Sequence, residues 1–146
     1  MVTYGTILSS LRAYLEEVTG VTSVWRYNGY TPPESDEYIA IRMANEVYES
    51  QTKLDELVTA SIYFNLASYS PDVVTQDITQ QKITEVLMYH TIPLYDYSGN
   101  QIGSFAVSRI TGVNSIPYGT GVESESTHIA VYTDFVVEVD HIKKRS

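Results

Sequence analysis

The chain contains no cysteine, which excludes a disulfide framework, a thiolate nucleophile and a cysteine-based zinc cluster. This composition fits a reducing compartment. The sequence also lacks any run approaching the roughly 20 apolar residues that a bilayer span needs, and its start lacks the basic, apolar and small-residue pattern of a secretion signal. We therefore expect a soluble, intracellular protein without a membrane partner.

Basic residues are scarce. Lys and Arg number 9 against 18 Asp and Glu, which gives a formal net charge of −9. A surface this acidic repels phosphate backbones, so tight nucleic-acid binding by counterion release is not expected. Such a protein can still lie next to DNA without binding it tightly.

Motifs for catalysis are missing as well. The sequence has no P-loop, no dinucleotide-type glycine fingerprint followed by a helix, and no histidine pair at i, i+4 spacing on a helix. The three histidines are scattered, and we interpret each as structural: His90, His128 and His141. We predict no catalytic residue, no cofactor and no metal.

Two acidic groups fit a metal-nuclease pattern poorly. Glu34 with Asp36, and Asp140 near Lys143, are not gathered on neighbouring strands in a cleft, as such sites require. A small metal-dependent nuclease or hydrolase that uses Asp134 or Asp140 stays open as a remote alternative.

The residues that are present favour one domain over 1–146, long enough to bury roughly two thirds of its unfolded surface. Tyrosine occurs 13 times, against three Phe and one Trp. Its apolar ring and polar tip suit half-buried surfaces and subunit contacts, although strands favour tyrosine in any case.

The first element predicted is a helix. Thr6 is a candidate cap, Gly20 can end the helix in the left-handed conformation, and the apolar stripe is Ile7, Leu8, Leu11, Tyr14, Leu15 and Val18. A strand is expected over 21–27, followed by a loop over 28–37 that holds Pro32 and Pro33.

Alternating apolar residues predict long strands over 38–43, 58–66 and 129–139. The polar, acidic segment at 45–56 has two interpretations, a long hairpin arm or a flexible loop. An arm that reaches beyond its own core usually has a contact to make.

A second helix is predicted from Ser70 and Pro71, with Pro93 after its end. Its part from Thr79 to His90 carries the clearer apolar stripe. A hairpin is predicted over 94–109, with its turn at Ser98-Gly99-Asn100. We also expect an exposed loop near 112–127 and a short basic tail at 141–146. The element order predicts an α+β fold, a mainly antiparallel sheet with two helices packed on one face.

Side chains on the strands are candidates for contact with a neighbouring copy, and ordinary cross-strand pairing explains the aromatic ones equally well. The candidate interface residues are Tyr38, Arg42, Tyr48, Tyr63 and Tyr132.

The order of helix, strand, long arm, helix, hairpin and long final strand resembles the tail terminator and tail-completion proteins of long-tailed, siphovirus-type bacteriophages. The residues that carry the likeness are Ile7-Leu8-x-x-Leu11, Val24-Trp25, Tyr38-Ile39-Ala40-Ile41, Ala60-Ser61-Ile62-Tyr63-Phe64, Ile83-x-x-Val86-Leu87 and Ala130-Val131-Tyr132-Thr133-Asp134-Phe135. It spans most of the chain, as patterns of hydrophobicity.

The resemblance implies a structural virion protein. It implies a ring of six identical subunits that docks on the last ring of the tail tube, stops its growth and meets the head connector protein. Such a protein belongs to the tail and neck of the virion and assembles in the host cytoplasm. DNA would pass through the ring without specific binding, repelled by carboxylates lining the lumen; the candidates are Glu46, Glu49, Glu123 and Glu125.

Other functions remain possible at this point. A head-side connector or stopper protein of the neck would bind the portal complex instead of the tail tube. A non-viral regulatory or adaptor module is a further alternative, beside the metal-dependent enzyme.

Overall fold

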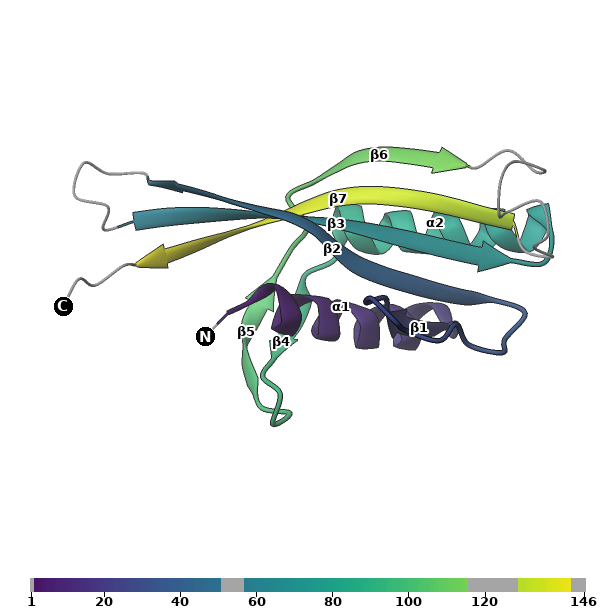
Figure 1. The fold of residues 1–146 in the computed structure, drawn as a ribbon, viewed down its shortest axis with the longest axis horizontal. Helices are drawn as coiled ribbons and strands as arrows, with labels where there is room; N and C mark the ends of the chain where they lie inside the picture. The colour runs from purple at the N-terminus through teal and green to yellow at the C-terminus, as the bar shows by residue number, and fades with distance from the viewer. Residues whose placement is uncertain (1, 51–56, 116–128, 143–146) are drawn as a thin grey trace.

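The computed structural model describes residues 2–50, 57–115 and 129–142. Within these residues the elements are α1 (Tyr4–Thr19), β1 (Thr22–Trp25), β2 (Tyr38–Ser50), β3 (Leu57–Ser70), α2 (Val73–Tyr89), β4 (Ile92–Tyr95), β5 (Gln101–Phe105), β6 (Arg109–Ser115) and β7 (Ile129–Ile142). Five strands form one sheet in the order β1-β2-β3-β7-β6, and β4 and β5 form a separate hairpin (Figure 1). Only β1 and β2 pair in parallel. The predicted α+β class is confirmed.

One hydrophobic core lies between the sheet and the helices, and both helices contribute to it. Phe64 of β3 and Phe135 of β7 are direct cross-strand partners, and their rings stack at 5.4 Å between centroids. The other fully buried members include Ile7, Leu8, Leu11 and Leu15 of α1, Ile39, Ile41 and Leu66 of the sheet, and Ile83 of α2. The sheet therefore has a helix-covered face and an opposite one, which we call the outer face.

Helix α1 begins earlier than the sequence predicts. Thr3 is the N-cap, and it forms a reciprocal pair with Thr6, in which the backbone N–H of each residue donates to the hydroxyl of the other at 3.0 and 3.3 Å. Thr6 is thus the third helical residue, and its prediction as the cap was wrong. Gly20 ends the helix with φ of 72°, as expected.

Helix α2 is capped by Asp72, whose side chain accepts hydrogen bonds from the backbone N–H and the hydroxyl of Thr75 at 2.8 and 3.0 Å. The prediction of Ser70 as the cap was wrong, because Ser70 is the buried last residue of β3. The helix ends at Tyr89, and Pro93 lies within β4.

The first half of α2 rests on the sheet through polar side chains. Gln76 lies against the hydroxyls of Ser68 and Ser70, and Gln80 donates to the hydroxyl of Thr133 at 2.9 Å. These contacts turn the polar side of the helix inward. They explain why three apolar residues of the same turns are exposed: Val73, Val74 and Ile78.

The predicted strand after the Gly99 turn is two strands. Gln101–Phe105 pairs with β4, whereas Arg109–Ser115 leaves the hairpin and pairs with β7 in the main sheet. The loop predicted near 112–127 therefore starts later than expected, because residues 112–115 belong to β6. Residues 116–128 and the basic residues at 143–146 lie outside the described part of the chain.

Candidate subunit interface

A three-stranded arm extends past both helices, on the left of Figure 1. It consists of Ala44–Ser50, 57–63 and 136–142, from β2, β3 and β7. The pairing runs to its end: Ser50 lies opposite Val58 on one side of β3, and Leu57 opposite Ile142 on the other. The predicted acidic segment at 45–56 is therefore a strand as far as Ser50, and the interpretation as a flexible segment was wrong there. Residues 51–56 lie outside the described part.

A bulge at the base of the arm reverses which residues of β2 face the helices. The register of β2 against β3 shifts between Met43 and Asn45, so Ala44 has no partner in the ladder. Before the bulge, odd-numbered residues such as Ile41 lie on the helix-covered face. After it, Glu46 pairs with Ile62 of that face, so Glu49 shares the outer face with its partner Thr59.

The arm has open strand edges. β1 pairs with β2 only as far as Ile41, and the backbone N–H of Arg26 then donates to Ile41 at 2.7 Å. No strand in the described residues pairs with the free side of β2 over 42–50. On the other side of the arm, β6 pairs with β7 over residues 131–136 only. Residues 139–142 of β7 therefore also lack a neighbour among the described strands. Open edges of this kind present unpaired N–H and C=O groups that a second chain can bond.

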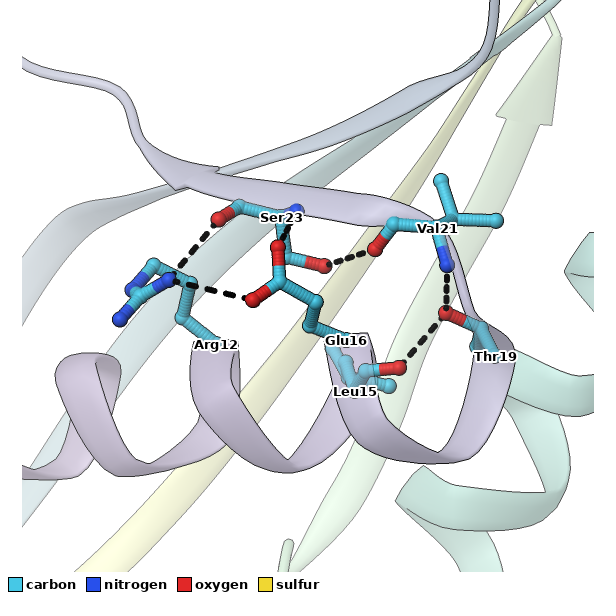
Figure 2. Close-up of polar contacts among 6 residues, drawn as sticks. All are labelled: Arg12, Leu15, Glu16, Thr19, Val21 and Ser23. Carbon is cyan, nitrogen blue, oxygen red and sulfur yellow. Dashed lines mark hydrogen bonds and ion pairs between the residues drawn. The ribbon is translucent and has the colours of Figure 1, made fainter.

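The edge at β1, in contrast, is closed by α1 (Figure 2). The carboxylate of Glu16 accepts the backbone N–H of Ser23 at 3.2 Å, and the guanidinium of Arg12 donates to the carbonyl of the same residue at 3.1 Å. The hydroxyl of Thr19 accepts from the N–H of Val21 at 3.1 Å. Ser23 is only 1% exposed. The sheet is therefore protected at β1 and open along the arm.

An open groove of about 770 Å³ lies on the outer face beside the base of the arm. We call it the arginine groove, since it holds two guanidinium groups; its lining residues are Arg26, Tyr27, Asn28, Gly29, Tyr30, Arg42, Met43, Asn65 and Tyr132. Arg26 lies over the ring of Tyr30, at 5.8 Å from its centroid. Among the described residues, neither arginine forms an ion pair.

One carboxylate lies near the groove and is already engaged. Asp134 accepts a hydrogen bond of 2.7 Å from the side-chain amide of Asn65, which is the cross-strand partner of both Arg42 and Asp134. The amide therefore separates the acid from the arginine. The groove keeps a positive character in a chain whose net charge is −9.

Tyrosines pack next to the groove. Tyr38 stacks on Tyr69 with ring centroids 4.5 Å apart, and Tyr69 meets Tyr132 edge to face at 6.5 Å. Burial, together with a hydrogen bond to Tyr132, raises the pKa of Tyr69, so its hydroxyl stays neutral. Since Tyr38 is only 8% exposed, most of its ring contacts its own chain.

The predicted interface residues lie in different places. Arg42 and Tyr132 line the arginine groove. Tyr63 lies on the outer face in the arm, between Asn45 and Val136, whereas Tyr48 lies on the other face, where its hydroxyl donates to Glu46 at 3.4 Å. Their role in a subunit contact remains a prediction.

The predicted lumen acids do not share one surface either. Glu46 and Glu49 lie on opposite faces of the arm because of the bulge, and Glu123 and Glu125 lie outside the described residues. Sequence reasoning missed Arg26, because it lies inside the predicted strand over 21–27 and no motif marks it, whereas β1 ends at Trp25. It also missed the closure of the β1 edge, because no pattern in sequence pairs Glu16 with Ser23.

The described residues hold no metal cluster, and the acids of the remote enzymatic alternative have other partners. Residues 2–50, 57–115 and 129–142 contain no group of three or more His, Asp or Glu residues able to hold a metal ion. Asp134 is bonded by Asn65, and Asp140 accepts the hydroxyl of Thr59 at 2.6 Å. None of the helices described has the length and apolar character to cross a membrane.

Comparisons with known proteins give one weak structural similarity. No protein-family model matches the sequence, and the curated proteins gave no match. Among solved structures, the chain is similar to one from the "Virion of native gene transfer agent (GTA) particle", with 13% sequence identity and a TM-score of 0.48 over 94% of this chain and 100% of that chain. A likeness below a TM-score of 0.5 establishes neither a shared fold nor a shared function.

Proposed function

We propose that this protein is a non-enzymatic structural protein of a virion, and that it works by associating with copies of itself. The observation that carries the proposal is the arm, which extends past the core with open strand edges while the edge at β1 is closed. Exposed edges favour pairing between chains, and natural monomers usually protect them. A long open edge in a protein with one edge already covered therefore indicates a contact surface.

The finer proposal is a phage tail terminator. It is supported by the resemblance of the sequence to tail terminator and tail-completion proteins, which rests on the same order of elements from the first helix to β7. In this role six copies form a ring at the end of the tail tube, and the ring meets the head connector protein at the neck of the virion. Assembly takes place in the host cytoplasm.

A closed ring needs a heterologous interface, in which one surface of each copy meets a different surface of the next. The sheet offers two such surfaces, which have no strand partner among the described residues: the side of β2 over 42–50 and the outer side of β6 at the opposite end of the strand order. A continuous contact around the ring can form from these.

The net charge of −9 supports a passage for DNA rather than a binding site for it, because a lumen lined with carboxylates repels phosphates. Glu46 and Glu49 point to opposite faces, so only one of them can line a lumen built from one face of the arm. Glu123 and Glu125 remain candidates from sequence.

The proposal is tested by measuring the mass of the purified protein in solution over a range of concentrations, alone and with tail tubes of the same virus, and by imaging the particles. We expect rings that bind the tube end. Binding to the portal complex in place of the tube would favour the head-side connector. A chain that stays solitary at high concentration, both alone and with tubes, would overturn the proposal.

The same preparation tests the enzymatic alternative. Turnover of a nucleic acid or ester with added divalent metals, lost on Asp134→Asn or Asp140→Asn, would contradict a purely structural role. We expect no turnover from any of the three proteins.

A further inference from the structure

Two oppositely charged surfaces lie on the same outer face of the sheet. One is the arginine groove at the base of the arm, with Arg26 and Arg42. The other lies near the end of the arm, where Glu49, Thr59 and Asp140 form one cross-strand row. We call this second surface the acidic row.

The acidic row carries two carboxylates, and neither has a cationic partner among the described residues. Asp140 accepts the hydroxyl of Thr59 at 2.6 Å, and Glu49 is exposed on the other side of the same threonine. In the described residues neither acid forms an ion pair. Arg109, a described cation on the same face, forms an ion pair with Glu138 at 3.0 Å.

The two surfaces cannot meet within one chain. Arg42 and Glu49 are on the same strand of a paired sheet, and seven residues of strand span about 20 Å. Three strands bonded along their length hold that separation. Glu49 and Asp140 can therefore reach an arginine groove only on another molecule.

We propose that the arginine groove takes the acidic row from the arm of a second copy of this chain. Guanidinium groups bind carboxylates through charge-assisted, often bidentate hydrogen bonds, which fix the geometry of a contact as well as its strength. The groove is open, with a volume of about 770 Å³, so its guanidinium groups are accessible from outside the chain. The contact joins unlike surfaces, so it can repeat from copy to copy as the heterologous interface that a ring needs.

Nucleic acid is a poorer occupant for the groove. The net charge of −9 opposes a phosphate backbone and a second copy alike, but the acidic row presents its two carboxylates at fixed positions on paired strands, which suits charge-assisted hydrogen bonds to guanidinium groups. The inference rests on the self-association proposed above, and it assigns Glu49 to the subunit contact. Glu46, on the opposite face, is left for the lumen.

Charge reversal and charge exchange test this contact. The groove variant carries Arg26→Glu and Arg42→Glu, the arm variant carries Glu49→Lys and Asp140→Lys, and the exchanged variant carries all four substitutions. Self-association is measured by analytical ultracentrifugation at low and high salt, with circular dichroism to establish that each variant is folded. The matched controls are Lys82→Glu and Glu85→Lys, exposed positions on α2 away from the outer face.

We expect the groove and arm variants each to associate about tenfold or more weakly than the wild type, since each leaves like charges facing one another. The exchanged variant should regain association, and the two controls should match the wild type. Mixing the groove variant with the arm variant should restore association to assemblies in which the two alternate, because each arm then meets a groove of opposite charge. Association of the wild type should weaken as salt rises.

Three results separate this inference from the proposed function. If the wild type and the folded groove variant form the same rings, the groove contact is overturned and the ring stands. If the wild type forms only a reciprocal dimer that both variants lose, the contact stands and the ring is contradicted. If the wild type stays solitary alone and with tail tubes, both fail.

A fourth result concerns the other occupant. Short single-stranded DNA that binds the wild type, and is released by Arg26→Glu with Arg42→Glu while self-association is unchanged, would show that the groove serves nucleic acid and would overturn the inference.

Discussion

Single side chains set the ends of both helices, and the two helices use different chemistry. Thr3 and Thr6 cap α1 with neutral hydroxyls, whereas Asp72 caps α2 with a carboxylate. A carboxylate at a helix N-terminus is favoured by the helix dipole as well as by the N–H groups it accepts. Only the second helix therefore gains a cap that responds to pH.

Asp72 should give α2 an acid-sensitive stability. Hydrogen bonds from the backbone N–H and hydroxyl of Thr75 hold the pKa of Asp72 below its ordinary 3.8. Because the folded pKa is lower than the unfolded one, the contribution is fully present above pH 3.8 and is lost as the pH falls through the lowered folded value. Asp72→Asn keeps an acceptor and removes the titration, so its Tm should fall less between neutral pH and pH 2 than that of the wild type.

The measurement is a set of thermal melts followed by circular dichroism across the acid range. Asp77→Asn, an exposed acid within the same helix, is the control and should keep the wild-type slope. Equal acid sensitivity of the two variants would show that the cap does not carry this effect.

At the level of strands, the closure of β1 leaves the arm with open edges while the opposite end of β2 is covered. Glu16 and Arg12 take both backbone groups of Ser23, which is buried. Without them the edge of β1 would be a further open edge of the sheet. The side chains of α1 thus act on the sheet as well as on the core.

Glu16→Ala should destabilise the protein by about 1 kcal/mol, because the buried N–H of Ser23 loses its acceptor. Glu16→Gln retains an oxygen acceptor and should recover most of that loss. The check is the free energy of unfolding from urea titrations, with Glu17→Ala as the control, expected within about 0.5 kcal/mol of the wild type. If the free energy of unfolding of Glu16→Ala equals that of the wild type, water accepts the N–H of Ser23 as well as the carboxylate does.

The sequence predicts elements well where apolar residues repeat with a clean period. The stripe of α1 through Ile7 and Leu11, and the alternation of β7 through Phe135, give both elements correctly. It fails where polar groups do the packing. The first half of α2 is buried through Gln76 and Gln80, and an amide directed at a serine or threonine has no signature in hydrophobic periodicity.

The candidate interface follows the same division. The polar segment at 45–56 has a long hairpin arm as one of its two interpretations, and the alternation of the strands beside it gives the faces on which Arg42 and Tyr132 lie. The bulge at Ala44 could not be predicted, because the local sequence around it continues to look like regular strand. Assigning Glu46 and Glu49 to one surface missed this shift of register.

For the molecule as a whole, the arm is the part that lacks a second layer. Helices cover the body of the sheet, while the strands of the arm continue past them (Figure 1). Backbone groups at an uncovered edge exchange with water unless another chain bonds them. Assembly should therefore change the hydrogen exchange of backbone amides in the arm more than in any other described part of the chain.

Hydrogen exchange should locate the contact. The outward-facing amides of β2 over 42–50 should exchange rapidly in dilute protein and at least about tenfold more slowly in the assembled state. The amide of Ser23 should be protected in both states, since Glu16 already accepts it, and serves as the internal control. Unchanged exchange over 42–50 in assembled protein would place the subunit contact elsewhere.

The single unpaired residue at Ala44 imposes a parity rule on the length of the arm. Adding or deleting one residue between Ala44 and Glu49 would move that acid from the outer face to the helix-covered face, because side chains alternate along a strand. A change of two residues would return it to its original face. Related chains that keep the acidic row should therefore differ in arm length by even numbers of residues.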